Sequence, residues 1–208
     1  MLRSVSKCEG HRAEARDPAT LDLWYYRELG VIQGSTLRVR RYVGQLFEAL
    51  GSFPPAHRPG ASALEVGCGI SPYAGAIDAA GYRYRGLDPS PHAVTWMERL
   101  WPGCMACGTL EAVNPGKRFA LILAAHVLEH VEDAPGAIRK LAGMLEPGGE
   151  LWLIVPDDSD PVNPDHKWFF TEATLRAAVV GARLFVSRIS VRKIIERENF
   201  IYLRAVRP

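Results

Sequence analysis

Two glycines follow a short apolar run and form the first candidate binding site of the chain. The run covers residues 63–66 and leads directly into Gly67, Cys68 and Gly69. Glycine lacks a Cβ atom, so the backbone at such a turn can come close to a bound molecule. A glycine-rich turn can also be only a tight connection between a strand and a helix. Other residues are therefore needed before a ligand is assigned here.

An acidic residue follows at the spacing that a nucleoside-binding site requires. Asp88 lies 21 residues after Gly67 and ends the second apolar run, residues 82–88. An ionised aspartate only accepts hydrogen bonds, so the two hydroxyls of a ribose are its natural partners at this position. The alternative is that Asp88 only caps the helix that begins near Ser90. Together, the glycine-rich turn and Asp88 predict a nucleoside cofactor.

Short apolar runs alternate with helix-length segments, and this order predicts a parallel sheet with crossover helices. The predicted strands cover residues 63–66, 82–88, 103–109, 119–125, 150–156, 183–191 and 199–206. The predicted helices between them cover residues 72–80, 90–100, 133–146 and 171–180. Ligands of such sheets bind at the carboxyl ends of the strands, where the glycine-rich turn and Asp88 are expected to meet.

The first 60 residues have a different pattern. Apolar residues at helical spacing predict two helices there, and segment 51–60 ends them with three prolines and two glycines. We therefore predict an N-terminal helical extension or lid over residues 1–60 and one core domain over residues 61–208.

The composition is that of an ordinary globular protein. The chain has 208 residues, of which 48% are hydrophobic and 23% are charged, which excludes collagen-like, disordered and disulfide-scaffold classes. A net charge of +2 gives no general attraction to nucleic acid, and we predict no nucleic-acid partner. No apolar run approaches the ~20 residues of a membrane span, and we predict no membrane partner.

Four cysteines occur without an export signal near the N-terminus, which predicts a reducing, cytoplasmic location. Cys104 and Cys107 have the spacing of a redox pair or of half a zinc site, but no second pair follows. We therefore expect them to be small buried hydrophobic residues.

At the level of motifs, the chain resembles the class I S-adenosylmethionine-dependent methyltransferases. The similarity is greatest to the small single-domain group of ubiquinone and menaquinone biosynthesis methyltransferases, and it covers roughly residues 61–180. It rests on "LEVGCGIS" (64–71), "YRGLDPSPHAV" (84–94), "FALILAAHVLEHVED" (119–133), "LAGMLEPGGELWLIVPD" (141–157) and "HKWFFTEATLRAAV" (166–179). Ser71 stands where many relatives have a third glycine.

The resemblance implies a fold, a cofactor and a set of contacts. The expected fold is α/β: a Rossmann-like, doubly wound sheet of seven mostly parallel strands with an antiparallel C-terminal strand. The expected cofactor is S-adenosylmethionine. The residues that the resemblance places around it are Glu65, Gly67, Cys68 and Gly69 at the methionine moiety, Asp88 at the ribose, Pro89 at the adenosine, Thr109 and Leu110 at the adenine, and Ala124, Ala125 and His126 near the sulfonium.

Two histidines are candidates for a general base, the group that removes a proton from the methyl acceptor. His126 and His130 are four residues apart on a predicted helix start, so both can lie on one face, as a base and its support or as metal ligands. His126 is the first candidate, and His166, in the acidic loop 156–166, is the second. We expect Glu129 to face solvent. The acidic loop lacks regular ligand spacing, so we predict no metal site.

The aromatic residues Trp24, Tyr25 and Tyr26 lie together in the N-terminal extension. They either attach a helix to the core or close over the cofactor, since aromatic faces attract a sulfonium cation. We count Tyr25 and Tyr26 among the candidate cofactor contacts.

The predicted reaction is methyl transfer from S-adenosylmethionine to an oxygen, nitrogen or carbon atom of a small-molecule acceptor, by a monomer or homodimer. A non-catalytic cofactor-binding module is the main alternative. A nicotinamide-dependent oxidoreductase is a weaker one, because the third glycine of its fingerprint would fall at Pro72.

Overall fold

The structure is a computed structural model, and it describes residues 36–114, 116–157, 166–195 and 198–208. Trp24, Tyr25 and Tyr26 lie outside the described residues, as does most of the acidic loop. Among the described residues, no helix is long and apolar enough to cross a membrane.

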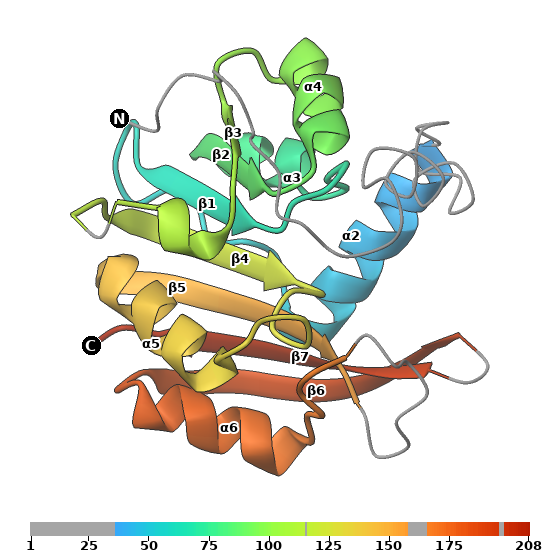
Figure 1. Cartoon of the computed structure of the whole chain (residues 1–208), viewed down its shortest axis with the longest axis vertical. Helices are drawn as coiled ribbons and strands as arrows, with labels where there is room; N and C mark the ends of the chain where they lie inside the picture. The colour runs from blue at the N-terminus through green and yellow to red at the C-terminus, as the bar shows by residue number, and fades with distance from the viewer. Residues whose placement is uncertain (1–35, 115, 158–165, 196–197) are drawn as a thin grey trace.

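Seven strands form a single sheet in the order β3-β2-β1-β4-β5-β7-β6 (Figure 1). Strands β1 to β5 are parallel, and β7 is antiparallel to both of its neighbours, β5 and β6. This confirms the predicted doubly wound α/β fold with an antiparallel C-terminal strand. The strands are β1 (Ser62–Val66), β2 (Arg83–Asp88), β3 (Met105–Cys107), β4 (Phe119–Ala125), β5 (Leu145–Pro156), β6 (Phe185–Ile195) and β7 (Glu198–Val206).

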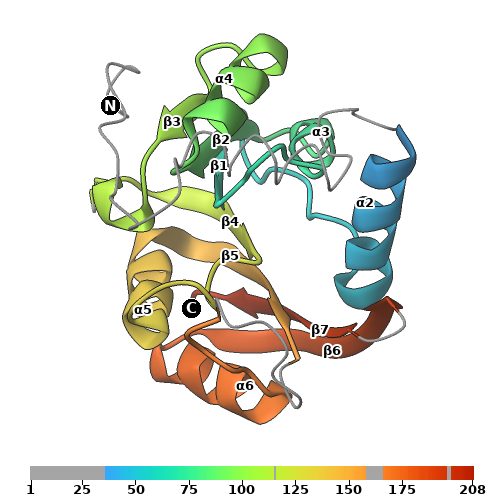
Figure 2. The same cartoon turned by 45° about the vertical axis from the view of Figure 1, so that its right-hand side comes forward.

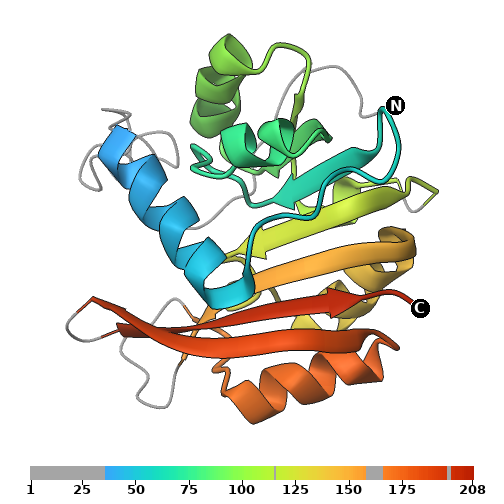
Figure 3. The same cartoon turned by 180° about the vertical axis from the view of Figure 1, so that it is seen from behind.

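Helices cover both faces of the sheet. Helices α5 and α6 lie on the face nearer the viewer in Figure 1, and α2, α3 and α4 lie on the opposite face, seen in Figure 3. The helices are α2 (Thr36–Leu50), α3 (Ala74–Ala79), α4 (Pro91–Leu100), α5 (Ala134–Met144) and α6 (Glu172–Gly181), with a short 3-10 helix, η1 (Leu110–Ala112).

Strand β4 shows why this sequence needs two helical layers. Its side chains alternate between the faces: Leu121 and Leu123 pack in the core on the α2–α3–α4 side, and Ile122 and Ala124 pack in the core on the α5–α6 side. A strand buried on both faces needs a continuous apolar sequence, and this explains why 119–125 contains no charged residue.

Several boundaries differ from the sequence-based predictions; strand β5, for example, begins at Leu145 and not at residue 150. Strand β3 is shorter than predicted because Gly103 and Gly108, with φ of 71° and 148°, turn the chain at both of its ends. Helix α5 begins at Ala134, where the side chain of Asp133 accepts a hydrogen bond from the N–H of Gly136 at 2.8 Å. This agrees with the predicted start at residue 133, whereas the expectation that His126 and His130 lie on a helix start is wrong, because residues 128–130 form a turn.

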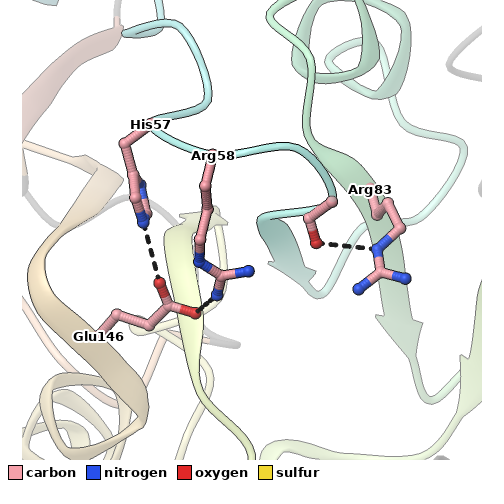
Figure 4. A network of polar contacts seen from close by, with 5 residues as sticks. His57, Arg58, Arg83 and Glu146 are labelled. Atoms are coloured by element: carbon pink, nitrogen blue, oxygen red, sulfur yellow. Dashed lines mark hydrogen bonds and ion pairs between the residues drawn. The ribbon is translucent and has the colours of Figure 1, made fainter.

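The proline-rich segment after α2 is tied to the sheet by polar contacts (Figure 4). Glu146 of β5 accepts from Arg58 and lies 3.3 Å from Nε2 of His57, and Nε of Arg83 donates to the carbonyl oxygen of Gly60 at 2.9 Å. Glu146 and Arg83 lie at the starts of β5 and β2. The segment is thus fixed at the edge opposite the carboxyl ends of the parallel strands, which leaves those ends accessible.

Candidate active site

A cavity of about 1090 Å³ opens where β1, β2 and β4 end. Figure 2 turns this side of the sheet toward the viewer. The cavity is lined by ten of the predicted site residues: Glu65, Gly67, Cys68, Gly69, Asp88, Pro89, Thr109, Leu110, Ala125 and His126. The sheet topology thus brings together four sequence segments, 65–69, 88–89, 109–110 and 125–126.

Two predicted residues are not among those that line the cavity, although His166 is next to the lining residue Lys167. Ala124 is fully buried in the hydrophobic core on the α5–α6 side, because alternation along β4 turns its side chain away from that of Ala125. His166 lies beside His130, with their ring centroids 5.1 Å apart, and is not part of the lining. Tyr25 and Tyr26 lie outside the described residues.

The glycine-rich turn has a left-handed backbone at both of its glycines. Gly67 has φ of 63° and Gly69 has φ of 51°, in the region that residues with a side chain rarely adopt. A Cβ atom on Gly67 would also lie 2.3 Å from Cγ2 of Val127. From the sequence, these glycines are expected where a ligand comes close to the backbone. The structure adds a second reason at Gly67, which is contact with the segment after β4.

Asp88 fastens this turn to the end of β2. The residue is 6% exposed; Oδ2 accepts from the backbone N–H of Gly69 at 2.7 Å, and Oδ1 accepts from the backbone N–H of Ser90 at 2.8 Å. The cap of α4 is Ser90, whose Oγ accepts from the N–H of Ala93. The two carboxylate oxygens thus hold the turn at the wall of the cavity, which Asp88 lines.

Glu65 is a buried carboxylate at the cavity wall. It is 2% exposed, and its Oε2 accepts from the hydroxyls of Ser71 at 2.6 Å and Tyr84 at 2.8 Å. Burial raises the pKa of Glu65 from 4.5 to about 7, and the hydrogen bonds from Ser71 and Tyr84 oppose this rise. Ser71 stands where many relatives have a third glycine. Its Oγ also accepts from the N–H groups of Tyr73 and Ala74, so Ser71 stabilises the start of α3.

Cys68 is a buried residue of this turn with no sign of reactivity. Its side chain is 5% exposed, and burial raises the pKa of its thiol well above 9. The thiol is therefore neutral at physiological pH and packs as a small apolar group.

His126 directly follows β4 and has a strained backbone. Its φ is 57°, its N–H donates to the carbonyl oxygen of Ile154 at 2.9 Å, and its ring contacts the ring of Phe200 edge-on at 4.8 Å between centroids. A left-handed conformation at a residue other than glycine costs free energy, and such residues are concentrated at functional sites. Strand β5 and Phe200 of β7 fix the position of this imidazole at the cavity.

Glu129 is buried, and the expectation that it faces solvent is wrong. Its side chain is 1% exposed, Oε1 lies 3.5 Å from Nδ1 of His126, and Oε2 has no hydrogen-bond partner among the described residues. The turn at 128–130 directs this side chain inward, whereas the helix assumed from the sequence would have directed it outward. The carbonyl oxygen of Glu129 accepts from the N–H groups of Lys167 and Trp168, which brings His166 close.

Glu129, His130 and His166 form a cluster that the sequence analysis missed. Their potential ligand atoms all lie within 4.8 Å of one another. Glu129 and His130 are adjacent in the sequence. His166 comes near them because the N–H groups of Lys167 and Trp168 donate to the carbonyl oxygen of Glu129. The arrangement could hold a divalent cation.

Comparison with known proteins agrees with this geometry. Residues 37–200 match the family model described as a methyltransferase domain. Over 91 residues the chain is 32% identical to a ubiquinone biosynthesis O-methyltransferase of Bradyrhizobium sp. (strain ORS 278), a match that covers 41% of this chain and 36% of that protein. It is 28% identical over 151 residues to a protein of the same description from Xanthomonas campestris pv. campestris (strain B100), covering 69% and 57% of the two chains.

A solved structure shows the same fold. The 1,6-didemethyltoxoflavin-N1-methyltransferase of Burkholderia thailandensis, determined with 1,6-didemethyltoxoflavin and S-adenosylhomocysteine bound, superposes with a TM-score of 0.67. The two chains are 15% identical, and the alignment covers 95% of this chain and 93% of that one.

The family match includes the glycine-rich turn, Asp88, the end of β4 and His126, which are the parts that line the cavity. The chain spans only 36% to 57% of the length of these two curated relatives. The match to the family model, however, covers residues 37–200, which is most of this chain. The chain therefore belongs to the methyltransferase domain family, and it is a member of the class I S-adenosylmethionine-dependent methyltransferases that its sequence resembles.

Proposed function

We propose that this protein transfers the methyl group of S-adenosylmethionine to an oxygen, nitrogen or carbon atom of a small-molecule acceptor. The observation that carries the proposal is that one cavity contains both the turn fastened by Asp88 and the imidazole of His126. When bound, the cofactor supplies an electrophilic methyl group on a sulfonium. The protein then mainly has to orient the acceptor and accept any proton that it loses.

The residues of the cavity fit this cofactor. Asp88 presents lone pairs for the ribose hydroxyls, and Thr109 and Leu110 line the part of the cavity next to β3, where we place the adenine. Glu65 places a carboxylate near Gly67 and Gly69, where its ionised form can attract the ammonium group of the methionine moiety. Pro89 and Ala125 complete the walls at the adenosine and the sulfonium.

The size of the cavity supports a second ligand. A typical small-molecule pocket has a volume of roughly 300 to 1,000 Å³, and this cavity, at about 1090 Å³, exceeds that range. The acceptor would therefore share the cavity with the cofactor. Tyr25 and Tyr26 of the N-terminal extension are proposed to cover both ligands, with residues 1–60 acting as the lid of the core domain 61–208.

His126 is the proposed general base. It lines the cavity at the end of β4, whereas the second candidate, His166, lies outside the lining. A base is useful only if the acceptor must lose a proton, so His126 favours hydroxyl or ring N–H acceptors over carbon acceptors that are already anionic. This assignment makes His126 the residue whose loss should affect rate more than binding.

The test is product formation with a panel of acceptors. The purified protein is incubated with S-adenosylmethionine and catechols, phenols, N–H heterocycles or amines, and S-adenosylhomocysteine is measured by mass spectrometry. The proposal expects acceptor-dependent product. Cofactor binding without turnover on any acceptor found in a cell extract would favour the non-catalytic binding module, and binding of a nicotinamide dinucleotide instead would favour the oxidoreductase.

We infer that the protein acts in the cytoplasm as a monomer or homodimer, without nucleic acid. The near balance of 25 basic and 23 acidic residues supports the last point, since phosphate-binding proteins concentrate positive charge. Size-exclusion chromatography with light scattering tests the oligomeric state.

A further inference from the structure

The strongest unexplained feature of the molecule is a buried carboxylate beside the proposed base. Glu129 is 1% exposed, and its Oε2 has no hydrogen-bond partner among the described residues. A buried charge is costly unless a nearby group of opposite charge or a hydrogen-bond donor compensates for it. A partner for this carboxylate must therefore lie nearby. Among the described residues, Nδ1 of His126 lies 3.5 Å from Oε1 of Glu129, within ion-pair distance.

The geometry separates the two nitrogens of the His126 ring. Nδ1 is next to the buried carboxylate, and the ring lines the cavity. Nε2 is separated from Nδ1 by the Cε1 atom, and with Nδ1 beside Glu129, Nε2 is the nitrogen that we assign to a molecule in the cavity. The bond from the His126 N–H to Ile154 and the edge contact with Phe200 limit rotation of the residue.

We propose that Glu129 is a positioning residue that acts through His126. The Glu129 carboxylate attracts the proton of a neutral imidazole to Nδ1, which leaves the lone pair of Nε2 directed to the cavity. When Nε2 takes the proton of the acceptor, the ring becomes a cation, and Glu129 balances its charge without being protonated itself. This is how a carboxylate supports a histidine base in unrelated hydrolases.

His130 and His166 also approach Glu129, with potential ligand atoms within 4.8 Å. His126 differs from them in its ion-pair distance to the carboxylate and in its place directly after β4. The role of Glu129 in proton transfer rests on the proposed function, whereas its contact with His126 does not. The position of the imidazole proton can be tested without any acceptor.

The first test is nitrogen NMR of protein labelled with ¹⁵N-histidine, at a pH where the imidazoles are neutral, with His126→Asn used to assign the signal. The proposal expects His126 to carry its proton on Nδ1 in the unsubstituted protein and to shift toward the Nε2–H form in Glu129→Leu. A proton on Nε2 in the unsubstituted protein would overturn the proposal, even if no variant at position 129 folds. An Nδ1 proton that persists in folded Glu129→Leu would overturn it as well.

The second test is kinetic and uses the acceptor found in the panel described above. Glu129→Gln keeps the shape and removes the charge, so kcat should fall roughly 10- to 100-fold, the equivalent of one hydrogen bond to a charged group. The KM for S-adenosylmethionine should stay the same. In a His126→Ala background, Glu129→Gln should change kcat less than about twofold, because the carboxylate then has no base to support. An equal loss in both backgrounds would show that Glu129 only supports the fold.

A matched control is Glu172→Gln on α6, which removes an exposed carboxylate that lies 3.7 Å from Arg176. It should leave both the spectrum and kcat unchanged. Calorimetry with S-adenosylmethionine separates the two possible failures: an unbound cofactor refutes the proposed function, and a bound cofactor with the wrong His126 tautomer refutes only the role of Glu129.

Discussion

The carboxylate of Asp88 accepts a hydrogen bond at 2.7 Å from the backbone N–H of Gly69, a residue 19 positions earlier in the chain. Its other oxygen accepts from the N–H of Ser90. One buried side chain therefore joins the glycine-rich turn after β1 to the end of β2. The shape of the proposed cofactor site therefore depends on Asp88 even before a ligand binds.

Asp88→Ala should weaken binding of S-adenosylmethionine and S-adenosylhomocysteine by about 1.5 to 3 kcal/mol, the range for hydrogen bonds to a charged group. The loss combines the missing ribose contacts with a turn that is no longer fastened. Isothermal titration calorimetry measures it, and Asp78→Asn, on the exposed surface of α3, is the control. Unchanged affinity in Asp88→Ala would contradict the assignment of the ribose site.

Gly67→Val should lose cofactor binding and also lower the free energy of unfolding. The new side chain meets Val127 at 2.3 Å and must adopt a φ of 63°, and overpacking of this kind typically costs about 1 to 3 kcal/mol. Chemical denaturation and calorimetry measure the two effects. Adding Val127→Ala should restore part of the stability but not the binding. Normal stability together with normal binding would show that the turn has no special role.

The stability of the protein should depend on pH through Glu65. Burial raises its pKa in the folded state from 4.5 to about 7, so the folded protein binds more protons than the unfolded chain between these values. The contribution of Glu65 is fully present below pH 4.5 and is lost as the pH rises through 7, by about 3 kcal/mol if the other groups are constant.

Urea unfolding of the unsubstituted protein and of Glu65→Gln at pH 5 and pH 8 tests this. The variant should lose less stability between the two pH values, because it has no carboxyl to ionise. A pH dependence identical to that of the unsubstituted protein would mean that Glu65 titrates normally.

His126→Ala should lower kcat by roughly 100- to 10,000-fold, the usual contribution of a general base, with little change in cofactor affinity. Single-turnover formation of S-adenosylhomocysteine measures it on an acceptor from the panel. His57→Ala is a matched control, because His57 is an exposed histidine bound to Glu146 at the other edge of the sheet. Full activity in His126→Ala would direct attention to His166.

Chelation by EDTA should leave turnover intact. S-adenosylhomocysteine is already a good leaving group when the methyl group is transferred, so the reaction needs no Lewis acid. The measurement is the rate before and after dialysis against the chelator. Loss of activity that returns with added zinc or magnesium would assign a metal to Glu129, His130 and His166, whose ligand atoms lie within 4.8 Å of one another.

Much of the fold follows from local sequence patterns. The apolar run of β4 contains no charge over seven residues, and a run of that length and polarity must be buried on both faces. Gly67 and Gly69 follow one predicted strand, and Asp88 ends the next. These residues lie close together because the carboxyl ends of neighbouring parallel strands share one edge of the sheet.

Other features depend on contacts between distant segments. The inward direction of Glu129 follows from the turn after β4 and from its bonds to Lys167 and Trp168, and neither is visible in a helical reading of residues 126–133. The constraint on Gly67 comes from Val127, which is 60 positions away and is brought near by the pairing of β1 with β4.

The sequence by itself therefore determined the layers of the sheet, the glycine-rich turn after β1 and the acidic residue that ends β2, because periodicity and glycine content are local properties. Only the tertiary structure decided which side chains near that turn are buried together. Burial of Glu129 beside His126 depends on how separate loops pack at the end of the sheet, and the distance between the two side chains, 3.5 Å, is set by that packing.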